Sequence, residues 1–165
     1  MWRRLRPTEL AAVFLRFALA AGFLSAVADR FGLWGPADTP GVSWGGFASF
    51  LAYTGTLLWF LPAGLVPVAG WVSTVLEVVL ALGLLAGFRL RAVALATGIL
   101  LLVFAVTMTA ALGFEPPLSY SVWSAAAAAF LLASLRPAGG DVGTRSSSYS
   151  SGSTETLSSA TFTLL

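Results

Sequence analysis

The sequence predicts an all-α integral membrane protein, a four-helix bundle with an interfacial amphipathic helix between spans one and two. Two observations lead to this fold class. Of the 165 residues, 58% are hydrophobic and 10% are charged, whereas a water-soluble domain carries about 25% charged residues. The sparse charges also leave long gaps, since none falls within residues 39–76, 92–114 or 116–135. Such gaps have room for membrane-spanning helices, which need roughly 20 apolar residues each.

Four apolar segments have about this length and are expected to cross the bilayer. The first, residues 10–28, follows three arginines and ends in Ala-Val-Ala, which is also typical of a cleavable signal peptide. Arg16 interrupts its apolar run and three more spans follow, so a retained span is the favoured interpretation. The other expected spans are residues 67–86, 92–112 and 118–135, the last being short.

A long connection joins the first two expected spans, and its two halves differ. The first half, from Asp29 to about residue 46, is rich in glycine and proline and is expected to be a loop. Over residues 47–61, apolar side chains recur at helical spacing, which predicts an amphipathic helix at the membrane interface, ended by Pro62. A fifth span is the alternative, but this segment is too short for one.

The chain is expected to consist of a membrane domain, residues 1–136, and a C-terminal tail, residues 137–165. The tail is dominated by serine and threonine, with several glycines. Such a segment cannot bury a hydrophobic core, so we expect it to be disordered. The sequence indicates no function for it.

The positions of the arginines predict how the chain crosses the membrane. Positive residues near spans concentrate on the cytoplasmic side. With a cytoplasmic N-terminus, only Arg30 faces outward, so both termini are expected to be cytoplasmic. Five of the six tryptophans then fall at the outer interface. The arginines on the inner side are Arg3, Arg4, Arg6, Arg89, Arg91, Arg136 and Arg145.

Two charges fall inside the expected spans, Arg16 in the first and Glu77 in the second. Each costs about 2.5–3.5 kcal/mol at mid-membrane, so each needs compensation. Their depths from the inner end differ by less than the reach of an arginine side chain, which predicts an Arg16–Glu77 pair. This pair would be either a structural lock or a polar site that faces a ligand. As a further alternative, Arg16 extends alone to the inner headgroups.

The absence of cysteine, histidine and lysine restricts the chemistry. The chain offers no thiolate, no imidazole base, no histidine haem ligand and no Schiff-base lysine. We therefore expect no covalent cofactor, no metal and no catalytic residue. The charge pattern does not suggest a nucleic-acid partner. Any redox function would have to use a bound molecule or a partner protein.

Several short stretches of the membrane region carry a family resemblance. In and after the first span these are Leu15-Arg16-Phe17, Gly22-Phe23-Leu24 and Asp29-Arg30-Phe31-Gly32. Around the second they are Glu77, Gly83-Leu84-Leu85, Gly87, Arg89 and Arg91-Ala92, and before the fourth Tyr120-Ser121-Val122-Trp123-Ser124. Together they resemble the DoxX family of small four-helix membrane proteins over residues 10–136.

The resemblance implies a place in the bacterial cytoplasmic membrane and a function near quinones. The family takes its name from subunits of a terminal quinol oxidase and of a thiosulfate:quinone oxidoreductase. The resemblance implies an accessory subunit, and a non-catalytic one is favoured over a catalytic one. A bound quinone is the expected ligand, and other subunits of a redox complex are the expected partners in the bilayer. The resemblance also places an intramembrane ligand site at Arg16 and Glu77, and candidate residues at the outer rim at Asp29, Arg30 and Tyr120.

Two functions of other classes stay open. A small membrane transporter or channel would use Glu77 as its coupling carboxylate in a homo-oligomer. A structural assembly protein would need no ligand at all. Transporters usually line their path with several ionisable groups, whereas the expected spans contain two charges that could neutralise each other. The pattern therefore favours the accessory subunit.

Overall fold

The computed structural model describes residues 6–135, which form helices joined by turns and one longer loop. Within that range there is no β-strand, so the predicted all-α class is confirmed there. The expected disordered tail lies outside the described residues. In chain order the elements are α1 (Pro7–Arg30), α2 (Phe47–Leu57), the short 3-10 helix η1 (Ala63–Leu65), α3 (Val66–Ala86), α4 (Leu90–Leu112), α5 (Glu115–Ser119) and α6 (Val122–Ser134).

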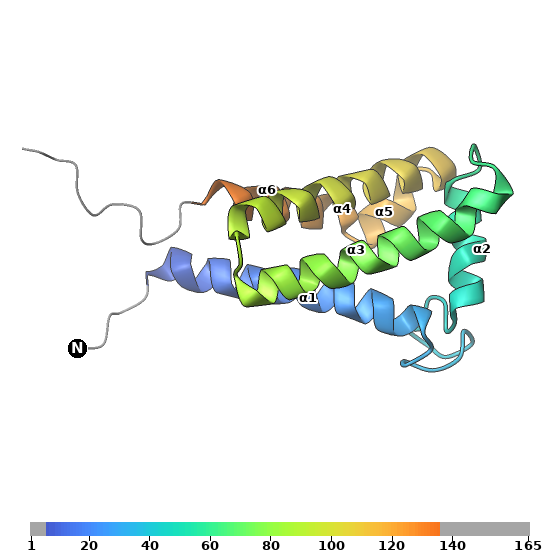
Figure 1. Cartoon of the computed structure of the whole chain (residues 1–165), viewed down its shortest axis with the longest axis horizontal. Helices are drawn as coiled ribbons and strands as arrows, with labels where there is room; N and C mark the ends of the chain where they lie inside the picture. The colour runs from blue at the N-terminus through green and yellow to red at the C-terminus, as the bar shows by residue number, and fades with distance from the viewer. Residues whose placement is uncertain (1–5, 136–165) are drawn as a thin grey trace, which may run out of the picture.

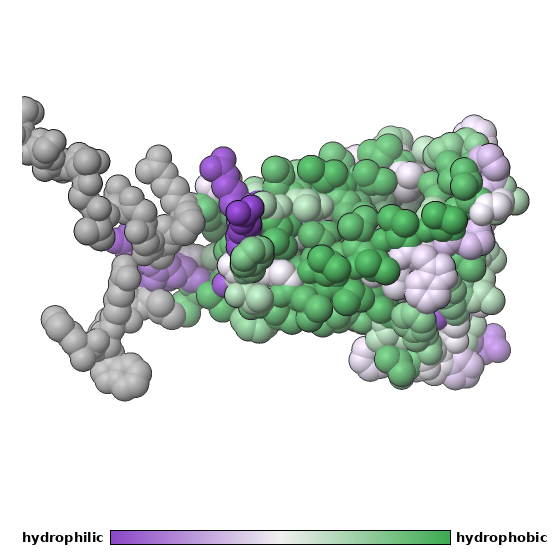
Figure 2. Space-filling view, in the orientation of Figure 1, coloured by the Kyte–Doolittle hydropathy of each residue, from purple (hydrophilic) through white to green (hydrophobic). Residues whose placement is uncertain are grey.

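Three helical segments are long and apolar enough to cross a membrane. They are Pro7–Arg30, Ala63–Ala86 and Leu90–Leu112, and they match the first three expected spans to within a few residues. At about 1.5 Å per residue, α1, α3 and α4 each cover the roughly 30 Å of a bilayer's hydrocarbon core. Apolar side chains cover the middle of the molecule (Figure 2), as a membrane protein requires.

The segment expected to be the fourth span differs from the prediction. Ser121 has a left-handed backbone conformation, with φ of 56°, which separates α5 from α6. Residues 118–121 therefore belong to α5 and the following turn rather than to a continuous span. The apolar helix α6 has 13 residues, or about 20 Å, which is less than the roughly 30 Å of the hydrocarbon core.

The long helices lie lengthwise in two pairs, α1 beside α3 and α4 beside α6, with α3 also against α4 (Figure 1). Small residues bring the second pair close together: a Cβ atom at Gly98 of α4 would lie 2.8 Å from the Phe130 ring of α6. The helix α2 crosses one end of the molecule (Figure 1), which we call the α2 end. The opposite end contains the turn from α3 into α4.

The helix expected over residues 47–61 is shorter than predicted. α2 begins at Phe47, as expected, but it ends at Leu57. Leu58 leaves the helical conformation, with φ of −104° and ψ of 41°, and a turn then leads to Pro62 and η1. Pro62 is thus not the residue that ends the helix. α2 buries Phe50 and Thr54 against the long helices, which brings its aromatic face to the candidate site.

Candidate functional site

A buried ion pair joins the last residue of α1 to the middle of α3. Arg30 Nη2 donates to Glu77 Oε1 over 2.6 Å, and Nη1 donates to Thr74 Oγ1 over 2.8 Å. Thr74 and Glu77 are three residues apart and therefore lie on one face of α3, so a single guanidinium group reaches both. The side chains of Arg30 and Glu77 are only 4% and 1% exposed. The charges thus meet in a region with almost no access for water.

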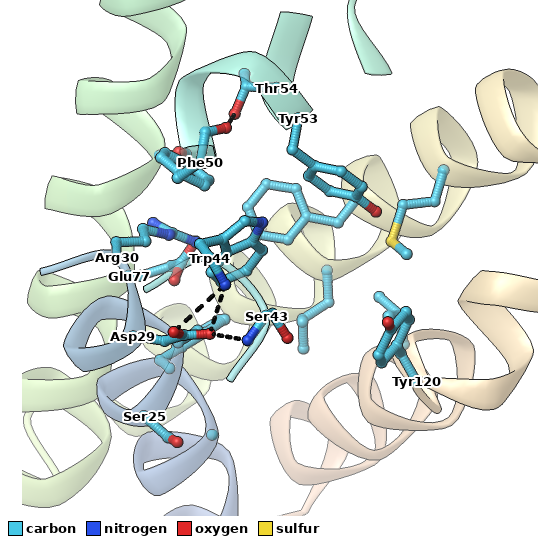
Figure 3. A pocket seen from close by; sticks show the side chains of 18 of the residues that line it. Ser25, Asp29, Arg30, Ser43, Trp44, Phe50, Tyr53, Thr54, Glu77 and Tyr120 are labelled. Atoms are coloured by element: carbon cyan, nitrogen blue, oxygen red, sulfur yellow. Dashed lines mark hydrogen bonds and ion pairs between the residues drawn. The ribbon is translucent and has the colours of Figure 1, made fainter. Parts of the chain in front are cut away.

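Aromatic rings from the loop and from α2 close over this pair. The Arg30 guanidinium carbon lies 4.0 Å from the centre of the Phe50 ring and 5.4 Å from that of Trp44. The Trp44 and Phe50 rings contact each other edge to face at 5.3 Å, and Trp44 is drawn beside the pair in Figure 3. A guanidinium over ring faces is attracted to them, so the rings both shield and stabilise Arg30.

Asp29, the neighbour of Arg30, fastens the loop to the end of α1. Its carboxylate accepts hydrogen bonds from the backbone N–H groups of Ser43, Trp44 and Gly45, with N–O distances between 2.9 and 3.4 Å. Successive N–H groups of this kind form a cradle for an anion. Gly45 has φ of 59°, and a Cβ atom there would lie 2.2 Å from the Ala37 backbone nitrogen, so the close approach needs glycine. The carboxylate thereby holds Trp44 in place.

The predicted Arg16–Glu77 pair does not form, and this prediction is wrong. Arg16 instead donates from Nε to the Leu84 carbonyl over 2.9 Å and from Nη2 to the Leu85 carbonyl over 3.1 Å. These carbonyls belong to the last turn of α3, where helix carbonyls carry partial negative charge and can accept from a side chain. Glu77 is already paired, because α1 continues as far as Arg30 and that side chain reaches it from the α2 end.

A large cavity lies beside the Arg30–Glu77 pair. Its volume is about 1230 Å³, and α1, the loop, α2, α3, α4 and the start of α6 all contribute to its wall. Most lining residues are apolar, while Asp29, Arg30 and Glu77 form one part of the wall. Apolar walls with a few placed polar groups are typical of small-molecule sites. The structure therefore offers room for a ligand with a large apolar part.

Two tyrosines line the same cavity from different parts of the chain. Tyr53 is half-buried in α2, and Tyr120, 67% exposed, lies in the turn before α6. Their rings face the cavity from opposite sides in Figure 3, and neither hydroxyl has a hydrogen bond drawn to the residues shown. Burial raises the pKa of the Tyr53 phenol above its ordinary value, and the Tyr120 phenol raises it further. Tyr53 is therefore a neutral hydrogen-bond donor at physiological pH.

The structure groups the predicted site residues differently from the expectation. Asp29, Arg30 and Glu77 lie together, and Tyr120 lies across the cavity from them (Figure 3). Arg16 is bound to the far end of α3. Sequence reasoning missed Thr74, Trp44 and Tyr53. Thr74 could have been found from its spacing to Glu77, whereas the other two come from a loop and a crossing helix that only the fold places. Within residues 6–135 there is no group of three potential metal ligands.

The sequence was also compared with known proteins. It matches no family model, no curated protein and no solved structure.

Replacing Glu77 by alanine should destabilise the protein strongly, because Arg30 would stay buried without its anion. Removal of one partner from a buried pair costs about 3–5 kcal/mol. We expect a lower melting temperature and less monodisperse protein in mild detergent. The double variant Arg30→Met/Glu77→Leu, which removes both charges, should recover most of the loss.

The matched control is Asp38→Ala, which removes an exposed carboxylate of the loop before α2 and should leave the melting temperature unchanged. A Glu77→Ala protein as stable as the wild type would show that the pair does not hold α1 to α3.

Asp29→Ala should loosen the loop while leaving the helices folded. Three backbone N–H groups would lose their acceptor, and each net hydrogen bond is worth about 0.5–1.5 kcal/mol. Amide hydrogen exchange at residues 43–45 should therefore speed up by about tenfold or more. Asp38→Ala again serves as the control. Unchanged exchange at these three amides would contradict the assigned role of Asp29.

Proposed function

We propose that this chain is a DoxX-type membrane protein that serves as an accessory subunit of a quinone-linked redox complex in the bacterial cytoplasmic membrane. In this proposal α1, α3, α4 and α6 form a four-helix membrane bundle, and α2 is the interfacial helix. The observation that carries the proposal is the cavity of about 1230 Å³, with its apolar wall and its polar groups near the α2 end.

A quinone suits such a cavity because it combines an apolar tail with a small polar ring. Ligand pockets commonly have volumes of about 300–1,000 Å³, so this one has room for part of a tail as well as a ring. The chain has no cysteine and no histidine. Electrons would therefore reside on the bound molecule and on partner subunits, with this chain as the binding subunit.

The surface of the described helices is consistent with partners inside the membrane. Large apolar side chains are exposed along α1, α3 and α4, among them Phe14, Phe17, Val75 and Val79. In a bilayer these side chains would meet lipid or the helices of other subunits. Exposed apolar surface of this extent would not be stable in water.

The proposed orientation places both termini in the cytoplasm and the α2 end outside. Arg89 belongs to the turn from α3 into α4 and Arg91 to the first turn of α4, at the opposite end from α2, where hydrophilic side chains gather in Figure 2. Alkaline phosphatase, which is active only outside the cytoplasm, should be active when inserted after Asp38 and inactive when fused to the C-terminus. Phosphatase activity of the C-terminal fusion would overturn the orientation.

Purification in mild detergent tests the proposed function. We expect extractable quinone to accompany the protein, together with a redox enzyme as a co-purifying partner. A clean homo-oligomer without quinone or redox partner would contradict the proposal and favour a transporter, a channel or a structural assembly protein.

A matched pair of variants makes this test specific to the cavity. Gly22 lines the cavity and a Cβ atom there meets nothing within 4 Å, so Gly22→Leu should occupy cavity space and reduce the quinone bound per chain. A Cβ atom at Gly64 also meets nothing within 4 Å, but Gly64 lies in η1 away from the cavity wall. Gly64→Leu should leave the bound quinone unchanged.

A further inference from the structure

The polar groups in the cavity wall differ in whether a ligand can reach them and form hydrogen bonds with them. Glu77 Oε2 and Arg30 Nε have no hydrogen-bond partner within the described residues, yet both atoms are buried, with almost no accessible surface. A ligand cannot reach them unless the side chains around them move. The Arg30–Glu77 pair therefore shapes the wall, and the groups that contact a ligand must be others.

Three of the six serine and threonine hydroxyls in the wall are held by their own helices. Thr54, Ser73 and Thr107 each donate to a backbone carbonyl three or four residues earlier. The other lining serines, Ser25, Ser43 and Ser49, have short side chains that keep the hydroxyl close to the backbone. A phenol differs, because its hydroxyl stands at the far end of a rigid ring.

Tyr53 and Tyr120 have the hydroxyls that are best placed for a ligand. They come from α2 and from the turn before α6, and Figure 3 shows them on opposite sides of the cavity. A protonated phenol donates one hydrogen bond, so the cavity presents one donor from each side.

The cavity also reaches the apolar side of the molecule. Val72 and Leu76 of α3 and Val103 of α4 line it, and they are 53%, 43% and 50% exposed. These residues therefore belong both to the cavity wall and to the outer surface of two helices that are long and apolar enough to cross a membrane. An apolar chain that starts in the cavity can pass between α3 and α4 into the surrounding lipid.

We propose that Tyr53 and Tyr120 together bind the carbonyl-bearing head of an amphiphile, whose apolar tail leaves the cavity between α3 and α4. Each phenol donates a hydrogen bond to a carbonyl oxygen of the head. Donors on opposite sides favour a head with acceptors at both edges, as in a 1,4-benzoquinone, and lipid esters share the same acceptor chemistry. The inference rests on the proposed function to the extent that it uses the same cavity.

The test compares three probes that have the same ten-carbon tail and differ in the head. They are a decyl-substituted 1,4-benzoquinone, decyl acetate as the ester, and decylbenzene, which has no carbonyl. Dissociation constants are measured for the full chain in lipid nanodiscs, for the wild type and for Tyr53→Phe, Tyr120→Phe and the double variant. Trp59→Phe, at an exposed aromatic residue outside the cavity wall, is the matched control.

Loss of one hydroxyl should weaken binding of the carbonyl probes about three- to tenfold, and loss of both about tenfold to a hundredfold. Decylbenzene binding should not change, because phenylalanine retains the ring. Trp59→Phe should bind all probes like the wild type. This selective loss would not arise if the tyrosines only supported the shape of the cavity.

The outcomes separate this inference from the proposed function. If the quinone probe binds the double variant as tightly as the wild type, the proposed binding role of the two tyrosines is wrong, while the quinone function stands. If only the ester binds, and its binding needs the two hydroxyls, the binding role of the tyrosines stands and the quinone function fails. The binding role of the tyrosines is also wrong if the variants weaken decylbenzene binding as much as binding of the carbonyl probes, or if neither carbonyl probe binds the wild type.

Discussion

The Arg30–Glu77 ion pair is the interaction on which the arrangement around the cavity depends. Either charge alone in an apolar, nearly water-free interior would be strongly unfavourable, so the end of α1 is bound to the middle of α3. Asp29, one residue earlier, binds three N–H groups of the loop. That contact places Trp44 over Arg30, and Phe50 brings α2 to the same point. Two adjacent residues, Asp29 and Arg30, thus position the polar part of the cavity wall.

Arginines hold α1 to α3 at two levels, and they do so by different means. Arg30 uses a carboxylate and a hydroxyl, whereas Arg16 uses two carbonyls at the C-terminal end of α3. The contact of α4 with α6 relies on small residues and close approach, as at Gly98. The cavity lies between the ion-paired side and the closely packed apolar side, and its wall combines both kinds of surface. This combination is the reason why an amphiphile is the proposed ligand.

The elements that could be predicted from the sequence are those fixed by local composition. Length and the absence of charge located α1, α3 and α4 to within a few residues. Two boundaries were missed because single residues set them. Ser121 separates α5 from α6 through its left-handed conformation, and Leu58 leaves the helix before Pro62 is reached. Neither Ser121 nor Leu58 is a glycine or a proline, the residues that usually mark a break, so the sequence did not indicate the exact position of either one.

The sequence by itself determined that this chain is helical and apolar, and that Arg16 and Glu77 would need compensation for their charge. This follows from the cost of charge in apolar surroundings, which is a property of each residue. Only the tertiary structure decided which partners they take. Partner choice depends on how far α1 extends, how the loop folds back and where α2 crosses. Distances between residues such as Arg30 and Glu77, or Tyr53 and Tyr120, are set by packing and not by spacing along the chain.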